Sequence, residues 1–161
     1  MYSPEALLDI HERAHCSLRK LLDHCRSLTP DELNRELPGF GYSSARLQLH
    51  HITMAQKYWL SVIEDRMSAD ENDADYPTID ALEAFRAQTF EKTAAYLTRA
   101  SSDELNTPRP MLTWRGDRPN LTPAHVILRT QTHIYQHQGQ IIAMCKLLGK
   151  PTLPGLDFPL A

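Results

Sequence analysis

The stretch THIYQHQGQIIAMCKLLG, residues 132–149, decides the fold, because its apolar residues recur at three- and four-residue steps. This spacing predicts one long amphipathic helix. Residues 121–123 (LTP) carry the signals of a helix start, and residues 149–151 (GKP) carry those of a helix stop. His133 and His137 are four residues apart, so they share one face of the predicted helix.

Three further segments have the same periodicity. They predict long helices from residue 4 to about residue 28, from residue 45 to about residue 66, and from residue 78 or 80 to about residue 100. Residues 29–32 (TPDE) start a short helical turn. Residues 68–77 (SADENDADYP) form a solvated crossover, and residues 111–117 (MLTWRGD) could form a small hairpin. The sequence therefore predicts an all-α protein, a four-helix bundle in a single domain over residues 1–161, with a long crossover between the second and third helices.

Composition argues against several classes of protein. The 161 residues carry a formal net charge of -3, so the chain lacks the basic surplus that binds phosphate backbones, and we expect no nucleic-acid partner. No apolar run approaches the roughly 20 residues of a membrane-spanning helix, and residues 1–15 lack the form of a signal peptide. We therefore expect a cytoplasmic protein with no membrane partner. Cys16, Cys25 and Cys145 include no C-x-x-C pair, which argues against a disulfide framework and a cysteine-based zinc site.

The histidines are the residues that indicate a possible metal site. His133 and His137 face the interior of the predicted bundle together with Gln140. Two desolvated imidazoles need either a shared cation or a hydrogen-bond network, and the residues alone leave both open. A third metal donor would come from the facing helix, where His51 lies at the centre of the apolar stripe and His50 is rotated by about 100° toward solvent.

Three neutral imidazoles with further positions open suit zinc, nickel or ferrous iron. Gln140, about one turn beyond His137, is a candidate to orient a water or thiol at the metal, or else a buried hydrogen-bonding partner. Arg129, one turn before His133, is a candidate to bind a substrate carboxylate, or else the member of an exposed salt bridge. Trp114, in the loop before this helix, could form part of a lid over one end of the bundle.

Residues 11–15 (HERAH) match the His-Glu-x-x-His pattern of zinc proteases. No predicted strand precedes this segment, no third ligand has a clear helical placement, and Glu12 turns toward solvent, which is poor for a general base. We therefore interpret His11 and His15 as residues at the boundary between surface and core. His11 could still line the metal cavity without binding the metal.

Two segments of the chain resemble the DinB/YfiT-like metalloenzymes. In that family an inward histidine precedes a Trp-Leu pair by eight residues, as His51 precedes residues 59–60 (WL). A His-x-x-x-His-Arg-Gly-Gln run lies on the family's fourth helix, and residues 133–140 follow that pattern in part. Gln138 stands where the family usually has arginine, and Gln136 stands where a further histidine is common.

The resemblance implies an up-down-down-up bundle that holds a divalent metal, zinc or nickel, on His51, His133 and His137, and often a homodimer. The activities assigned within the family are mostly metal-dependent transfers of low-molecular-weight thiols and related isomerisations. We therefore expect an enzyme that acts on a small-molecule substrate, by thiol transfer or by metal-assisted hydrolysis. Two alternatives stay open: a non-catalytic metal-binding stress-response protein, and a metal-free helical interaction module.

Overall fold

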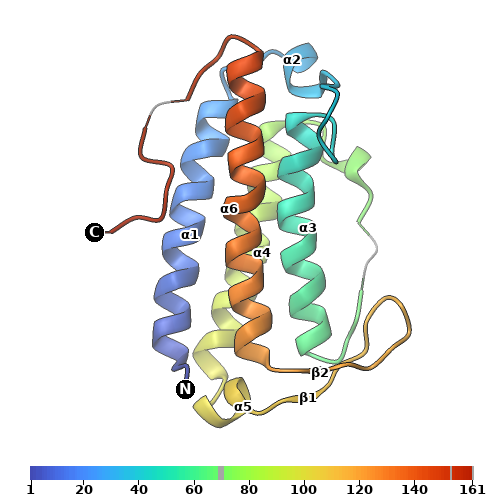
Figure 1. Ribbon diagram of the computed structural model, residues 1–161, viewed down its shortest axis with the longest axis vertical. Helices are drawn as coiled ribbons and strands as arrows, with labels where there is room; N and C mark the ends of the chain where they lie inside the picture. The colour runs from blue at the N-terminus through green and yellow to red at the C-terminus, as the bar shows by residue number, and fades with distance from the viewer. Residues whose placement is uncertain (69–70, 153, 161) are drawn as a thin grey trace.

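The computed structural model describes residues 1–68, 71–152 and 154–160 of the chain (Figure 1). Its four long helices are α1 (Pro4–Cys25), α3 (Ala45–Ile63), α4 (Ile79–Arg99) and α6 (Pro123–Leu147). The connections contain the short helices α2 (Pro30–Asn34) and α5 (Ser102–Asn106), the 3-10 helix η1 (Asp73–Asp75) and the strands β1 (Arg109–Pro110) and β2 (Asn120–Leu121). The predicted all-α fold is confirmed.

The four long helices form a bundle with the up-down-down-up order of chain directions. Figure 1 shows that α1 and α6 run upward while α3 and α4 run downward. α1 packs against α4 and α6, and α3 packs against the same two helices. Because α3 and α4 run in the same direction, the connection between them passes along the bundle, in line with the crossover predicted at residues 68–77. Residues 69 and 70 of that crossover, and residues 153 and 161, lie outside the described residues.

Local chemistry sets where the long helices begin and end. Ser3, Ser44 and Thr78 each accept a hydrogen bond from a backbone N–H in the first turn of α1, α3 and α4. Pro123 is the first residue of α6. Gly149 follows the end of α6 with a φ of +75°, a left-handed conformation that glycine adopts without strain. The long helices begin where the sequence predicted, and α6 ends at the predicted stop, although α1 and α3 end slightly earlier than expected.

A layer of buried polar residues divides the interior of the bundle into two apolar cores. One core lies toward α2 and includes Leu18, Ile52 and Ile134. The other lies toward α5 and includes Leu7, Leu97 and Ile127. The polar layer between them consists of His11, His15, Gln56, Arg86, Thr89, Thr93 and Gln131, all of them buried. Among the described residues, no helix is both long and apolar enough to cross a membrane.

The side of α3 that is buried differs from the prediction. His50, expected to turn toward solvent, is only 6% exposed, and its ring packs against those of Tyr76 and Phe85. His51 is half-buried at the edge where α3 meets α6. The prediction for His50 was wrong because it assumed one inward face, whereas α3 packs against both α4 and α6 and so buries two.

The connection between α4 and α6 contains structure that the sequence signalled only in part. The helix α5 was not predicted, although Ser101 caps it in the usual way by accepting a hydrogen bond from the backbone N–H of Glu104. A hairpin is present, but its strands flank the predicted segment: β1 and β2 pair antiparallel with Arg109 opposite Leu121, and residues 111–117 lie in the loop between them. This loop projects beside the lower part of the bundle near α3 (Figure 1).

Candidate metal centre

Three histidines from two antiparallel helices converge at the α3–α6 contact. Nε2 of His133 lies 3.2 Å from Nε2 of His51 and 3.1 Å from Nε2 of His137. One ring nitrogen from each residue lies within 4.8 Å of those of the other two, and these are the side chains that could hold a metal ion among the described residues. The structure thus brings together the three residues predicted as ligands.

These separations match the requirements of a bound divalent cation. Nitrogen ligands at about 2.0–2.1 Å from a metal are about 3.3 Å apart in tetrahedral geometry and about 3.0 Å apart in octahedral geometry. The two Nε2 separations at His133 lie between these values. Two of the three nitrogen separations therefore already suit zinc, nickel or ferrous iron, and the third, between His51 and His137, is at most 4.8 Å.

The three imidazoles are held in the neutral form that metal binding needs. Burial lowers the pKa of His51 to about 4, and the neighbouring His133 and His137 contribute to the same shift. The pKa of His133 is also lowered to about 4, first by burial and then by His137 and Arg129. Burial lowers the pKa of His137. At neutral pH each ring therefore keeps a lone pair for a cation.

Gln48 determines which nitrogen of His137 is free to bind a metal. The side-chain amide nitrogen of Gln48 donates hydrogen bonds to the backbone carbonyl of Tyr42 and to Oε1 of Gln140. The carbonyl oxygen of Gln48 must then face Nδ1 of His137, at 2.5 Å, and accept its proton. This tautomer leaves the lone pair of His137 on Nε2, where it faces His133.

Gln140, predicted as a catalytic candidate, lies on the far side of Gln48 from His137. Its carbonyl oxygen accepts the hydrogen bond from Gln48 and so helps to hold that amide in place. Gln48 is not among the residues predicted from the sequence for this site. A signal for it existed, because Gln48 precedes His51 by three residues on the same helix and a polar residue there needs a buried partner.

A cleft of about 430 Å³ opens beside the three histidines. It is lined by Tyr42, His51, Met54, Ala55, Tyr58, Trp59, Trp114, Arg129 and His133. The ring of Tyr42 stacks on that of His51 with 4.0 Å between the centroids. The backbone N–H of Trp114 donates to the hydroxyl of Tyr58, which ties the loop after β1 to α3. Trp114 thus forms one wall of the cleft.

Arg129 lies at the rim of this cleft. Its guanidinium is 5.4 Å from the centroid of the Trp59 ring. Within the described residues, no carboxylate forms an ion pair with Arg129, so the rim salt bridge considered from the sequence is not found there. The cleft lining contains no Asp or Glu among those residues.

The HERAH segment lies elsewhere, in the polar layer between α1, α3 and α4. His11 and His15 are 0% and 2% exposed, so their placement at a surface boundary was wrong. The side chain of Gln56 lies between them, accepting from Nε2 of His15 and donating to Nδ1 of His11. Nε2 of His11 donates to the backbone carbonyl of Phe90, and Arg86 donates to Nδ1 of His15. All four ring nitrogens therefore have partners other than a metal.

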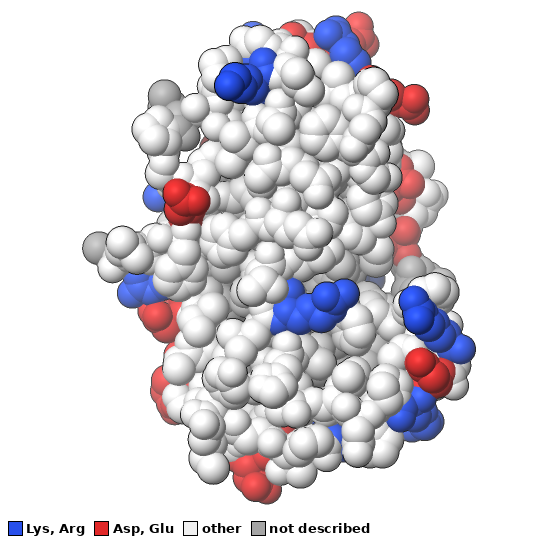
Figure 2. Space-filling view, in the orientation of Figure 1, with Lys and Arg blue, Asp and Glu red and all other residues white. Residues whose placement is uncertain are grey.

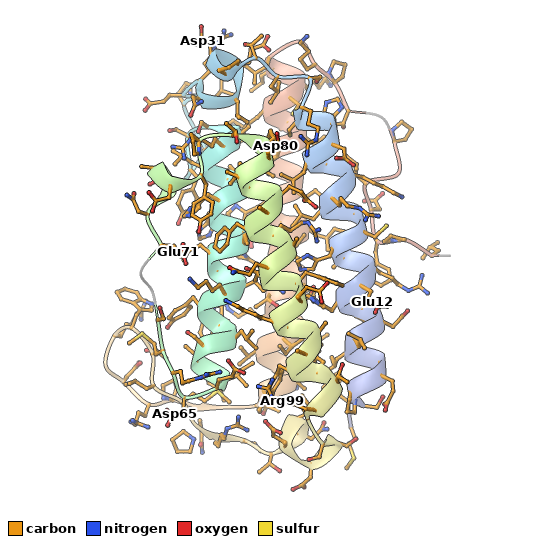
Figure 3. All side chains as sticks on the ribbon, turned by 180° about the vertical axis from the view of Figure 1, so that it is seen from behind. Glu12, Asp31, Asp65, Glu71, Asp80 and Arg99 are labelled. Atoms are coloured by element: carbon orange, nitrogen blue, oxygen red, sulfur yellow. The ribbon has the colours of Figure 1, made fainter. Side chains whose placement is uncertain are left out.

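This arrangement argues against the zinc-protease interpretation of HERAH. Glu12, the residue that would act as general base, is exposed on α1 and points away from the bundle interior (Figure 3). His11 does not line the cleft beside the three histidines. The two histidines instead help to join α1, α3 and α4.

The fold and the site together define a class of protein: a four-helix bundle in which two antiparallel helices present three histidines suited to one metal ion. The sequence pattern of the DinB family matches residues 10–161, and the chain belongs to that family. A conserved protein from Enterococcus faecalis has a similar crystal structure, with a TM-score of 0.67 and 15% sequence identity over 93% of this chain and 99% of that one. At this identity the likeness shows the shared fold. Among curated proteins, no sequence matches this chain.

Proposed function

We propose that the protein is a cytoplasmic, divalent-metal-dependent enzyme that acts on a small molecule, with zinc or nickel, or ferrous iron, held by His51, His133 and His137. The observation that carries this proposal is the convergence of three neutral imidazoles beside an open cleft. Catalytic metal sites typically keep a position open for substrate, while structural sites are closed by four protein ligands. Among the described residues no fourth His, Cys, Asp or Glu joins the three histidines, which favours a catalytic site.

A cation at this site would lower the pKa of a coordinated thiol or water, which suits transfer of a low-molecular-weight thiol or hydrolysis of a small molecule. The protein's own residues supply orientation. Gln48 and Gln140 fix the ring of His137, so Gln140 acts through Gln48 as a positioning residue. Arg129 supplies a cation for a substrate carboxylate at the rim. In thiol transfer, sulfur forms a bond to an electrophilic carbon, the leaving group departs with its bonding pair, and the thiol proton passes to solvent.

The first test is metal content per chain by elemental analysis after purification without chelators. The wild-type protein should contain close to one divalent metal per chain, and a His51→Ala, His133→Ala, His137→Ala triple variant should contain none. Metal retained by the triple variant would place the site elsewhere. The matched control is a His11→Ala, His15→Ala double variant, which changes the other spaced pair and should keep its metal.

The second test separates an enzyme from a non-catalytic metal-binding protein. Metal-loaded protein would be incubated with thiols and electrophiles, and with small esters and amides, against the triple variant. Turnover that depends on the three histidines supports the enzyme. Metal binding without turnover of either class would favour the metal-binding stress-response protein, and failure to bind zinc, nickel or iron would favour a metal-free interaction module.

The proposal also includes a homodimer, which the family resemblance implies. On the face of the bundle shown in Figure 2 most of the charged side chains lie toward the edges, although a basic group also lies near the middle. A face of this kind is compatible with an isologous contact between two copies. Sedimentation equilibrium should give twice the chain mass, and a monomer at all concentrations would remove this part of the proposal.

A further inference from the structure

The cleft beside the three histidines has aromatic walls. Tyr58 and Trp59 of α3 contribute two rings at 5.1 Å between centroids, and Trp114 contributes a third from the loop after β1. The chain has only two tryptophans, and both of them line this cleft. Trp114 is 65% exposed although it is a large apolar side chain. Flat apolar ligands gain both buried area and ring stacking from such walls.

The cleft also carries one positive charge that nothing described in the structure neutralises. Arg129 is the one lysine or arginine in the described lining, and no acidic side chain accompanies it there. Its guanidinium lies over the ring of Trp59. A guanidinium stacked on an aromatic face keeps the N–H groups along its edge available, and these groups match the geometry of a carboxylate.

The position of Arg129 relates this charge to the metal centre. Arg129 and His133 are four residues apart on α6, so their Cα atoms are separated by about 6 Å along the helix axis. Both side chains also line the same cleft. A ligand held at Arg129 therefore needs only a short body to reach the three histidines.

We propose that the cleft binds small aromatic carboxylates, with the carboxylate on Arg129, the aromatic body against Trp59 and Trp114, and the reacting group a short linker away at the histidines. This substrate class makes the proposed function more specific. The placement of the reacting group at the histidines rests on that proposed function. Binding of the carboxylate and of the ring involves only residues of the chain. It can therefore be measured without metal, and its outcome is separate from that of the enzyme proposal.

The probe is 3-phenylpropionate, compared with the neutral 3-phenyl-1-propanol, on metal-free wild-type protein. Because both tryptophans line the cleft, intrinsic tryptophan fluorescence reports binding directly. The carboxylate should bind about tenfold or more tightly than the alcohol, the effect expected of a charge-assisted hydrogen-bonded pair. Equal affinities, or no fluorescence change with either ligand up to its solubility, would overturn the inference.

Two variants test the two parts of the binding site. Arg129→Gln should abolish the preference for the carboxylate and leave the affinity for the alcohol within about twofold. The control is Arg19→Gln, which replaces an exposed arginine on α1 and should change neither affinity. Trp114→Leu should weaken both ligands to a similar degree, with Trp59 as the remaining reporter. A preference that survives Arg129→Gln would overturn the inference.

A last measurement distinguishes binding of the carboxylate to Arg129 from binding of the carboxylate to a metal ion. The two affinities are measured again after zinc is added. A carboxylate preference that appears only with zinc and persists in Arg129→Gln means that the carboxylate binds the cation, which overturns the inference and leaves the enzyme proposal intact. A preference present without zinc, and lost in Arg129→Gln, supports the inference even if no turnover is found.

Discussion

Gln48 accepts a hydrogen bond from Nδ1 of His137, and this single contact fixes the tautomer of a metal-ligand candidate. The orientation of the Gln48 amide is itself determined, because its nitrogen donates to the backbone carbonyl of Tyr42, which can only accept. Helix α3 therefore contributes twice to the centre: His51 supplies a nitrogen, and Gln48, about one turn earlier, orients a ring that belongs to α6.

Replacing Gln48 by Ala should weaken metal binding by about tenfold to a hundredfold, the usual effect of removing a hydrogen-bond partner behind a metal-binding histidine. The ring of His137 would lose the acceptor that keeps its proton on Nδ1. Zinc affinity would be measured by competition with a chromophoric chelator at fixed pH.

Gln48→Glu separates the contact with His137 from the other two contacts of Gln48, because a carboxylate can accept the proton of His137 but cannot donate to Tyr42 or Gln140. If the contact with His137 is what matters, folded Gln48→Glu should keep its zinc affinity. Thermal unfolding of both variants without metal would show whether either has lost its fold. Wild-type affinity in folded Gln48→Ala would show that the contact with His137 does not orient the ligand.

The two adjacent histidines of α3 should respond differently to truncation. His51→Ala should abolish metal binding and change stability little, because this side chain is half-buried at the edge of the bundle. His50→Ala should keep the metal and lower the free energy of unfolding by about 1–3 kcal/mol, because it opens a cavity beside Tyr76 and Phe85. Metal analysis with urea unfolding distinguishes the two, and loss of metal in both would mean that the ring of His50 reaches the site.

Periodicity predicted the bundle and the three converging histidines because helical spacing fixes which residues share a face. It misplaced His50 because a helix in a four-helix bundle has two packed neighbours, so residues adjacent in sequence are both shielded from water. Whether a histidine packs in the core or faces the metal site then depends on the helix that it contacts, which is a property of the tertiary structure.

The hydrogen-bond partners of the histidines could not be predicted from the sequence either, because they also depend on the neighbouring helices. His11 and His15 have the same four-residue spacing as His133 and His137, yet only the second pair is free to bind a metal. The difference lies in Gln56, a residue of another helix that bonds to a ring nitrogen of each histidine in the first pair. A pattern on one helix cannot show what the facing helix supplies.

Burial of His11 should make the protein less stable in mild acid. Burial lowers the pKa of His11 in the folded state to about 4, from the ordinary value of 6.5 for a histidine side chain. Between these two pH values the unfolded chain binds the additional proton, so the free energy of unfolding falls as the pH drops through that window. The contribution of one such histidine is at most about 1.4 kcal/mol per pH unit. Urea unfolding of metal-free protein at about pH 7.5, 6 and 5 measures the slope across this window.

His11→Gln isolates this contribution from those of the other histidines. Its stability should depend less steeply on pH than that of the wild type between about pH 6 and 5, because glutamine does not titrate. The amide can still donate to the carbonyl of Phe90, so the variant keeps the main hydrogen bond of His11. An unchanged slope would mean that His11 is protonated as easily in the folded protein as in the unfolded chain.

The wall of the cleft formed by Trp114 should loosen when its tether to α3 is removed. The hydroxyl of Tyr58 accepts a hydrogen bond from the backbone N–H of Trp114 at 3.0 Å, and Tyr58→Phe deletes that acceptor while keeping the ring. The Trp114 amide should then exchange with solvent about fivefold to tenfold faster, the effect of losing a hydrogen bond of about 1 kcal/mol. Hydrogen exchange followed by NMR measures it, with the amide of Ile134, buried in α6, as the reference that should not change. Equal rates in both proteins would show that the loop is held by its packing and by the β1–β2 pairing instead.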